Sequence, residues 1–468
     1  MTPRIQRVCC IGAGHVGGPT STVMAAQCPD IQFAVVDSDA ARIAAWNSDT
    51  LPIYEPGLAE IVGRQRGRNL CFSTDIDAAV GEADLVLLAV NTPLGQPGGH
   101  GLGGPTDLRS VEACARVVAR AARRSAIVVE KSTVPCRTGE LIARTLRHYG
   151  PADAEFQVLS NPEFLSEGTA VRDLLQPDRV IIGGLAGSED AQEALRALYA
   201  RWVPAERIVT MGMWSAELTK LASNALLAQR VSSINAVSAV CEAVGADIAD
   251  VARGCGMDSR IGSEFLRPSI GFGGSCFYKD LMGLVWLSES LGLHDVAEYW
   301  DQVLRMNDAQ TARFVRRIAR ALGPDLDGAQ IAILGFAYKA GTSDTRNTPA
   351  ALVCKQLLAR GARLAVYDPK VPEQQICDRL ATTSLADQQL RVCADAYEAM
   401  AGARAVLVLT PWAEFADIDW ARAHRLMVQP ALTVDGHRIL DDRALEQLGF
   451  HVISVGVHSS LADDKGGL

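Results

Sequence analysis

The stretch Arg7-Val8-Cys9-Cys10-Ile11-Gly12-Ala13-Gly14-His15-Val16-Gly17 decides the fold of the N-terminal part of the chain. An apolar run typical of a buried strand leads directly into a Gly-X-Gly-X-X-Gly turn, and helical sequence follows. The first glycine permits a tight turn, the second lets the backbone approach a pyrophosphate, and the third lets the helix pack close to the strand. This order predicts that residues 12–17, His15 and Val16 included, bind a dinucleotide, against the alternative of an ordinary glycine-rich turn.

The end of the second apolar strand, 32–36, indicates which dinucleotide binds. Asp37 follows this strand, twenty residues after Gly17. A carboxylate there accepts hydrogen bonds from both ribose hydroxyls and repels a 2′-phosphate, so NAD is favoured over NADP. Arg42 lies nearby and leaves NADP as the alternative.

Short apolar runs alternate with helical periodicity on both sides of a helical middle region, which predicts parallel strands joined by crossover helices. The segment 215–245 has no internal Gly or Pro and predicts one long helix, capped by Ser215 and ended by Gly245. We therefore expect an α/β fold with two Rossmann-like, doubly wound parallel-sheet domains (1–213 and 325–468) joined by a helical connector and dimerisation region (214–324). The expected strands are 7–11, 32–36, 85–90, 126–129, 157–159 and 180–182, then 331–334, 364–367, 405–409 and 432–434.

Composition narrows the functional classes. The chain has 468 residues, 48% hydrophobic and 21% charged, with a net charge of −9 and no long basic tract, so neither nucleic acid nor an anionic membrane is an expected partner. The apolar runs are far shorter than the ~20 residues of a spanning helix, and residues 1–7 do not resemble a signal peptide. We expect a cytoplasmic protein whose twelve cysteines are reduced and hold no metal.

A second glycine-rich loop ends in a cysteine. Gly271-Phe272-Gly273-Gly274-Ser275-Cys276 is followed by Lys279-Asp280. A nearby lysine and helix start favour a thiolate, and a neighbouring carboxylate can act as a base, so Cys276 is a candidate nucleophile. The alternative is an inert core cysteine.

Three further segments carry polar groups at positions where a ligand could bind. Lys220 and Asn224 lie one turn apart on the expected long helix, although a lysine among leucines can also extend to solvent. The segment 161–168 places Glu163 and Glu167 in a loop after a strand, which can also be only a capped turn. The segments 91–93 and 132–135 follow strands, at the sheet edge where open α/β folds bind ligands.

Taken together, these segments resemble the UDP-glucose 6-dehydrogenase family, within the wider group of nucleotide-sugar dehydrogenases. The similarity extends over nearly the whole chain and is greatest to the animal-type branch. It rests on Trp46-Asn47 through Tyr54-Glu55-Pro56-Gly57, Glu130-Lys131-Ser132-Thr133-Val134-Pro135, Ser160-Asn161-Pro162-Glu163-Phe164-Leu165, Lys220-Leu221-Ala222-Ser223-Asn224, Gly271 to Cys276, and Ile333-Leu334-Gly335-Phe336.

The resemblance implies a four-electron oxidation in which the C6 alcohol of UDP-glucose becomes a carboxylate and two NAD are reduced. Cys276 would capture the aldehyde as a thiohemiacetal that is then oxidised to a thioester. By the same resemblance Lys220 and Asn224 would stabilise the oxyanion, Asp280 and a water held by Thr133 would assist proton transfer, and Glu163 would assist thioester hydrolysis.

The resemblance also assigns ligand contacts, and it makes 325–468 the UDP-sugar-binding domain. NAD would contact Gly12, Gly14, His15, Val16, Gly17, Asp37, Arg42, Val90, Asn91, Thr92, Pro93, Ser132, Thr133, Glu167, Lys279 and Arg346. The UDP-sugar would contact Glu163, Phe164, Leu165, Glu167, Lys220, Asn224, Arg260, Arg267, Ser269, Gly271, Phe272, Gly273, Tyr338, Lys339 and Arg438. Arg260 would come from a neighbouring subunit of a homo-oligomer, a dimer or a hexamer built from dimers.

The chain departs from the family pattern in places. His15 replaces the usual Tyr, Tyr278 replaces Gln, and His437-Arg438 replaces a double arginine, which weakens the UDP assignment at that end. Two alternatives remain. One is a related enzyme acting on GDP-mannose or a UDP-N-acetylhexosamine, and the other is a catalytically dead NAD-binding regulator.

Overall fold

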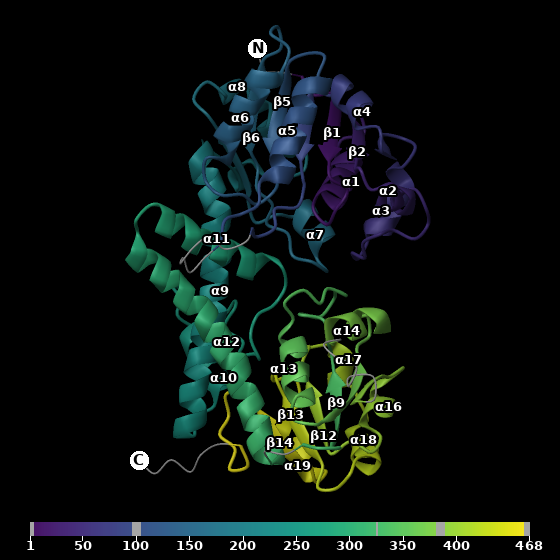
Figure 1. The fold of residues 1–468 in the computed structure, drawn as a ribbon, viewed down its shortest axis with the longest axis vertical. Helices are drawn as coiled ribbons and strands as arrows, with labels where there is room; N and C mark the ends of the chain where they lie inside the picture. The colour runs from purple at the N-terminus through teal and green to yellow at the C-terminus, as the bar shows by residue number, and fades with distance from the viewer. Residues whose placement is uncertain (1–3, 96–103, 324–325, 381–388, 463–468) are drawn as a thin grey trace. The chain divides into compact units, whose positions relative to one another are not determined.

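The computed structural model describes residues 4–95, 104–323, 326–380 and 389–462 (Figure 1). The chain divides into two compact units, the first being Met1–Ser223 with Met282–Ala297 and the second Asn224–Leu281 with Glu298–Leu468. Each unit contains one sheet, and each is described by itself.

The first unit is built on an eight-stranded sheet in the order β3-β2-β1-β4-β5-β6-β7-β8. Neighbouring strands are parallel except β6 and β7, which pair antiparallel, so the expected parallel sheet is correct for β1–β6 and wrong at this one junction. Strands β3 and β8 were not predicted, because partly exposed residues interrupt their apolar pattern. The strands are β1 (Arg7–Ile11), β2 (Gln32–Val36), β3 (Leu70–Ser73), β4 (Leu85–Leu88), β5 (Ala126–Glu130), β6 (Phe156–Ser160), β7 (Val180–Gly184) and β8 (Ile208–Gly212).

Helices cover both faces of this sheet. Side chains alternate along a strand, so the adjacent Cys9 and Cys10 of β1 enter different cores: Cys9 packs with α4–α6, and Cys10 with the helices of the other face. Helix α5 lies in front of the strands in Figure 1. The helices are α1 (Gly17–Gln27), α2 (Ala40–Trp46), α3 (Leu58–Gln65), α4 (Ile76–Glu82), α5 (Arg109–Ala121), α6 (Thr138–Tyr149), α7 (Ala170–Leu175), α8 (Glu189–Tyr199) and the 3-10 turn η1 (Ala205–Arg207).

The predicted long helix is α9 (Met213–Val244), and it contributes residues to both units. It ends before Gly245, whose φ of 78° is the left-handed conformation that favours glycine at a helix end. The predicted start is wrong by two residues, because β8 runs directly into the helix at Met213. Ser215 is therefore not the cap, and its backbone oxygen accepts a hydrogen bond from Thr219.

The second unit contains a six-stranded, wholly parallel sheet in the order β11-β10-β9-β12-β13-β14. The four predicted strands are observed, and each of their ends lies within one residue of the predicted end. The two edge strands of the sheet, β11 and β14, were not predicted. The strands are β9 (Gln330–Leu334), β10 (Arg363–Tyr367), β11 (Leu390–Val392), β12 (Ala405–Val408), β13 (Leu432–Asp435) and β14 (His451–Ser454). The remaining helices are α10 (Ile248–Gly256), α11 (Cys276–Ser290), α12 (His294–Leu322), α13 (Pro349–Leu358), α14 (Glu373–Leu380), α16 (Ala396–Met400), α17 (Ala413–Ala416), α18 (Trp420–Leu426) and α19 (Asp442–Gln447).

A buried ion network in the second unit fixes the segment that follows β14. The Glu242 carboxylate on α9 pairs with Arg313 and with Arg317 (2.8 Å), and it accepts a hydrogen bond from the backbone N–H of Gly456 (2.7 Å). The Arg317 guanidinium also donates to the backbone oxygen of Ser454. Helices α9 and α12 and the segment 454–457 thus share one buried carboxylate.

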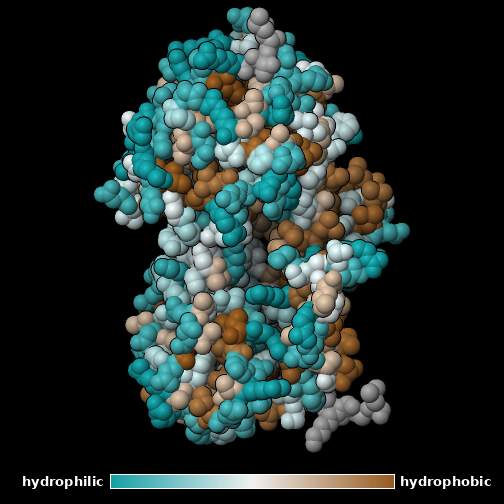
Figure 2. All heavy atoms as spheres, turned by 180° about the vertical axis from the view of Figure 1, so that it is seen from behind, coloured by the Kyte–Doolittle hydropathy of each residue, from teal (hydrophilic) through white to brown (hydrophobic). Residues whose placement is uncertain are grey.

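On the face drawn in Figure 2, polar residues predominate and apolar residues form separate patches. Among the described helices, none is long and apolar enough to cross a membrane. None of the twelve cysteines, all of which are described, forms a disulfide. Within the described ranges, no group of three or more His, Cys, Asp or Glu side chains could hold a metal ion.

Candidate active site

The three glycines of the first turn meet three different steric demands. Gly12 has a φ of 109°, and a Cβ there would lie 2.3 Å from the backbone oxygen of Ala89. A Cβ on Gly17, the first residue of α1, would lie 2.0 Å from the backbone oxygen of Gly12. A Cβ on Gly14 would meet nothing within 4 Å. The first and third glycines therefore serve packing, and the second leaves open space beside the turn, as a bound pyrophosphate requires.

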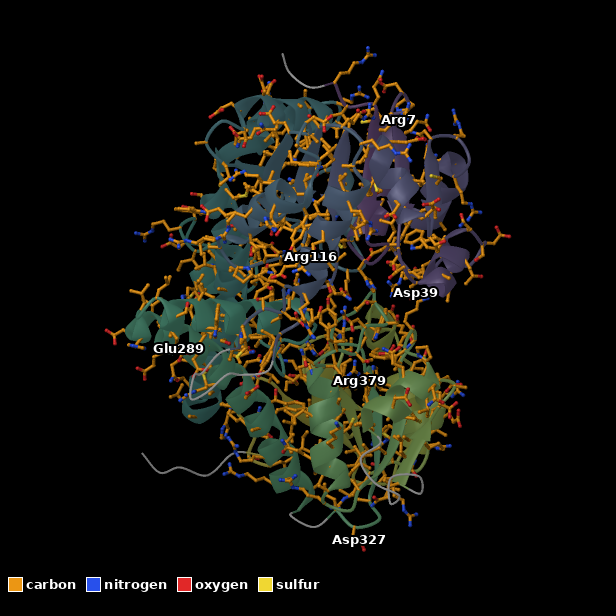
Figure 3. All side chains as sticks on the ribbon, turned by 45° about the horizontal axis from the view of Figure 1, so that its top comes forward. Arg7, Asp39, Arg116, Glu289, Asp327 and Arg379 are labelled. Atoms are coloured by element: carbon orange, nitrogen blue, oxygen red, sulfur yellow. The ribbon has the colours of Figure 1, made fainter. Side chains whose placement is uncertain are left out.

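Asp37 is held in place at the end of β2. Its carboxylate accepts hydrogen bonds from the backbone N–H of Ala13 (2.9 Å) and Asp39 (3.0 Å) and pairs with Arg42 (3.0 Å). Burial would raise the pKa of Asp37, but these hydrogen bonds and Arg42 outweigh it and lower the pKa. Arg42 also pairs with Asp39, which Figure 3 labels. The guanidinium is thus engaged by two carboxylates, which favours NAD over NADP.

The loops after β4 and β5 are joined by side-chain hydrogen bonds. The Thr92 hydroxyl donates to the backbone oxygen of Thr133 (2.7 Å), and the Ser132 hydroxyl donates to that of Val90 (2.7 Å). The structure therefore brings together Val90, Thr92, Ser132 and Thr133 at the carboxyl edge of the sheet. Asn91 and Pro93 belong to the same loop.

A buried ion pair lies at the end of β6. Lys220 Nζ is 3.0 Å from Glu163 Oε1, and both side chains are less than 10% exposed. The second Glu163 oxygen accepts the N–H of Leu165 (2.6 Å). Burial acts to raise the pKa of Glu163, but Lys220 and the Leu165 N–H outweigh it and lower the pKa. Lys220 does not extend to solvent, and its ammonium also lies 5.3 Å from the centre of the Phe164 ring.

The second unit holds the cysteine and its neighbours. Cys276 is the first residue of α11, and its side chain is exposed. Asp280, one turn later, is almost fully buried; its carboxylate pairs with Lys279 Nζ (2.8 Å) and accepts a hydrogen bond from Asn224 Nδ2 (2.5 Å). The Asp280 carboxylate thus holds the Asn224 side chain in place and forms an ion pair with the Lys279 ammonium.

The glycine loop before Cys276 is packed against the chain that follows β9. Gly274 donates its N–H to the backbone oxygen of Arg346 (2.9 Å). A Cβ on Gly273 would lie 2.6 Å from the backbone oxygen of Asn347 and 2.9 Å from the Tyr338 Cβ. Predicted residues 271–273, Tyr338 and Arg346 are therefore neighbours, and Lys339 follows Tyr338 in the chain. The Arg346 guanidinium pairs with Asp344 (2.6 Å).

Other predicted ligand residues are less tightly connected to these groups. Arg260 is largely exposed and pairs with Asp258 (2.6 Å), and Arg267 is exposed. Arg438 has a φ of 55° and donates to Asp247 (3.2 Å). The Ser269 backbone oxygen accepts a hydrogen bond from Gln310 Nε2, and the Ser269 N–H donates to Asn235 Oδ1. Glu167 is half-buried in the loop before α7.

Sequence reasoning missed several buried polar residues that hold the candidate site. The side chain of Asn307 on α12 accepts the N–H of Phe272 (2.7 Å) and donates to the Phe272 backbone oxygen, so it supports the glycine loop. Lys131 and Asn161 form a buried contact beside the Lys220–Glu163 pair. Each is a polar residue in an apolar pattern, which is the signal that could have identified it.

Comparison with known proteins places the chain. Three family models match successive segments: the UDP-glucose/GDP-mannose dehydrogenase family NAD binding domain (6–203), central domain (214–309) and UDP binding domain (332–442). The chain belongs to the UDP-glucose/GDP-mannose dehydrogenase family. A UDP-glucose 6-dehydrogenase of Oryza sativa is 51% identical over 96% of this chain and 97% of its own length. One from Drosophila melanogaster is 50% identical, with 96% of each chain covered.

The fold agrees with this family. A solved UDP-glucose dehydrogenase from the archaeon Pyrobaculum islandicum is 31% identical, with a TM-score of 0.85 and coverage of 98% of this chain and 99% of that one. The chain is an NAD-dependent dehydrogenase with two Rossmann-like sheets and helical connections, as a member of the UDP-glucose/GDP-mannose dehydrogenase family is expected to be. The similarity reaches plant as well as animal relatives.

Proposed function

We propose that this dehydrogenase oxidises the C6 alcohol of UDP-glucose to a carboxylate, reduces two NAD per sugar, and uses Cys276 as its nucleophile. The observation that carries the proposal is the position of Cys276, exposed at the N-terminal end of the 15-residue helix α11. The N-terminal end of a helix stabilises negative charge, and a thiolate is the reactive form of cysteine. Of the twelve cysteines only Cys71, Cys255 and Cys276 are exposed, and neither of the other two begins a helix.

NAD supplies the hydride acceptor in both oxidation steps, and the open turn at Gly14 with Asp37 beside it fits this cofactor. In the first step the alcohol loses a hydride and a proton and becomes an aldehyde. The Cys276 thiolate then adds to C6 and gives a thiohemiacetal, which loses a second hydride and becomes a thioester. Water cleaves the C–S bond, releases the carboxylate and restores the thiol.

The remaining polar groups have distinct roles in this proposal. Lys220 and Asn224 stabilise the oxygen that becomes negative at C6, which is usually worth several kcal/mol. Asp280, together with a water held by Thr133, takes up the proton, and Glu163 assists the water that attacks the thioester. The NAD and UDP-sugar contacts named from the resemblance are part of the same proposal.

The deciding experiment measures NADH formed per UDP-glucose consumed. We expect two NADH in the wild type and no carboxylate product from Cys276→Ala, with NAD binding intact. Cys276→Ser should be nearly as impaired, because a serine hydroxyl is scarcely ionised at neutral pH. Cys255→Ala, which removes another exposed thiol of the same unit, is the matched control. A Cys276→Ala protein that still forms two NADH at a near-normal rate contradicts the mechanism.

A second test addresses Lys220. An oxyanion role predicts that Lys220→Ala loses roughly 10²-fold or more in kcat, as removal of one oxyanion donor does elsewhere. A raised KM with normal kcat would instead indicate a role in substrate binding alone.

The substrate and assembly belong to the same proposal. The relatives that are 51% and 50% identical are UDP-glucose 6-dehydrogenases, which supports UDP-glucose over GDP-mannose. Initial rates with UDP-glucose, GDP-mannose and UDP-N-acetylhexosamines separate the alternatives, and absence of NADH with all of them would indicate a non-catalytic NAD-binding protein. We further propose a cytoplasmic enzyme with the domain boundaries 1–213, 214–324 and 325–468.

We also propose a homo-oligomer in which Arg260 reaches a neighbouring subunit's substrate. Large apolar side chains exposed on α9 support it, and six are described: Trp214, Leu218, Leu226, Val237, Val240 and Val244. Sedimentation of the purified protein tests the assembly, and mixing Arg260→Ala with Cys276→Ala subunits tests whether the arginine acts in trans.

A further inference from the structure

A buried lysine follows β5 in the first unit. Lys131 is 4% exposed, and its ammonium donates to Asn161 Oδ1 (3.0 Å) and to the Tyr199 hydroxyl (3.4 Å). The Tyr199 hydroxyl donates to the same Asn161 oxygen (2.7 Å). Both of these partners are neutral, and among the described residues no carboxylate forms an ion pair with this ammonium.

Burying an ammonium group in this way is costly, by several kcal/mol per ion as a general expectation. Burial lowers the pKa of Lys131 to about 8, while Glu163 acts in the opposite direction and Lys220 adds to the lowering. The side chain is therefore mostly charged near neutral pH. A charge retained at such cost invites a functional explanation.

Lys131 lies beside an ion pair that already has both of its charges. Glu163 is already engaged by Lys220 at 3.0 Å. Burial raises the pKa of Cys10 to about 12 and also raises that of Tyr199, so both groups are neutral. Burial likewise raises the pKa of Glu130, the last residue of β5, well above its ordinary value. Lys131 therefore adds a second ammonium group beside the Lys220–Glu163 pair.

We propose that Lys131 is a positioning residue whose buried ammonium adds a positive charge beside the Lys220–Glu163 pair and thereby favours the negative oxygen that develops during oxidation. The inference rests on the proposed function, in which Lys220 acts on that oxygen. In a water-poor environment a fixed charge acts over longer distances than in solvent, so Lys131 need not touch the substrate.

The competing explanation is structural. Lys131 could serve only to fix Asn161, which precedes Pro162-Glu163 and also donates to the backbone oxygen of Ile181 (2.7 Å). A charge role and a hydrogen-bonding role differ in their pH dependence. The charge disappears as the pH rises through about 8, whereas the packing around Asn161 does not change with it.

The test compares Lys131→Met with the wild type in steady-state assays with UDP-glucose and NAD from pH 6.5 to 9.5. Methionine keeps the length of the side chain and removes the charge, and Asn161 Oδ1 keeps its hydrogen bond from Tyr199. We expect kcat to fall about tenfold or more at pH 7, with both KM values within about twofold. The ratio of wild-type to variant kcat should decline towards one above about pH 9, where the wild-type lysine is also neutral.

Tyr199→Phe is the matched control, because it removes a hydroxyl partner of Lys131 and leaves the charge. Its kcat ratio to the wild type should be flat with pH. Lys131→Gln is the second neutral variant, and both neutral variants should fold because the Lys220–Glu163 pair remains intact. An equal kcat ratio at every pH, the same pH trend in Tyr199→Phe, or unfolding of both neutral variants overturns the inference. A wild type that forms no NADH contradicts the proposed function itself, whereas an active wild type matched by Lys131→Met contradicts only the role of Lys131.

Discussion

The first turns of the two sheets use the same backbone design with different contents. In the first sheet Gly12 donates its N–H to the oxygen of Val36, and in the second Gly335 donates to that of Tyr367, both at 2.8 Å. Both glycines have positive φ. A Cβ on Gly12 would lie 2.3 Å from the backbone oxygen of Ala89, after β4, and a Cβ on Gly335 would lie 2.4 Å from the Thr410 Cβ, after β12. An aspartate follows the second strand in each sheet, Asp37 and Asp368.

The two turns differ in what fills them. Asp37 holds only one N–H of its turn, and Gly14 beside it leaves open space. Asp368 accepts N–H groups from Phe336 (2.7 Å) and Ala337 (3.0 Å), and the Phe336 side chain is fully buried. The aspartate is thus a turn-holding residue in both sheets. The first turn is open at Gly14, whereas Phe336 and Ala337 of the second turn are fully buried, so the glycine rather than the aspartate distinguishes the proposed NAD site.

The largest expected effect comes from emptying the closed turn. Phe336→Ala should lower the free energy of unfolding by about 3–5 kcal/mol, because a fully buried ring leaves a cavity. The variant should not change the Kd for NAD, measured by titration of the intact protein. Tighter or weaker NAD binding in this variant would contradict the division of roles between the turns.

Removing the aspartates should have smaller and unequal effects. Asp368→Ala leaves the buried N–H groups of Phe336 and Ala337 without acceptors and should cost about 1–3 kcal/mol in thermal or denaturant unfolding. Asp37→Ala should lower the free energy of unfolding by less, since Asp37 accepts only one N–H group of its glycine turn, that of Ala13. It should instead weaken NAD binding and narrow the preference for NAD over NADP. Equal losses of stability in the two variants would show that the turns are equivalent.

Filling the open turn should separate binding from folding. Gly14→Val should raise the Kd for NAD about tenfold or more, because a side chain placed where the ligand passes costs about 1–3 kcal/mol. Stability should change little, since a Cβ at this position meets nothing. Gly63→Val, at another open glycine on α3, is the control and should leave the Kd unchanged. Unaltered NAD affinity in Gly14→Val would exclude this turn as the pyrophosphate site.

The smallest effect is the pH dependence of Asp37. Its folded-state pKa is lower than its ordinary value of 3.8, because hydrogen bonds and Arg42 outweigh burial. Its contribution to stability is therefore fully present above pH 3.8 and is lost as the pH falls through the lowered value. Unfolding curves of wild type and Asp37→Asn should converge in acid, and a constant difference from pH 6 to pH 2.5 would contradict this.

The sequence predicted the centre of each sheet and failed at its margins. Residues in β1 and β9 form uninterrupted apolar runs because both faces are covered, whereas β3 and β8 are partly exposed and lose that pattern. The reversal between β6 and β7 has no local signal, since a strand's direction depends on its partner. The start of α9 was misplaced because Ser215 looks like a cap, although β8 passes directly into the helix.

The candidate site was predictable where a motif carries it and not where contacts between distant segments do. The glycine turn and the loop before Cys276 were identified from local sequence. Asn307 and Lys131 were not, because their partners Phe272 and Asn161 lie 35 and 30 residues away in the chain. The Lys220–Glu163 pair likewise joins a helix to a loop, so spacing along α9 alone favoured a solvent-facing lysine.

The shared carboxylate of Glu242 sets an order of events during synthesis. Gly456, one of its donors, is 214 residues further along the chain. At about 5–20 residues per second, the ribosome adds that donor roughly 10–40 s after Glu242. For that interval the carboxylate lacks a partner that its buried position requires, so the second unit completes its core only when nearly the whole chain has been made. Chains stalled before residue 454 should therefore remain protease-sensitive in this unit, while the first sheet is already protected.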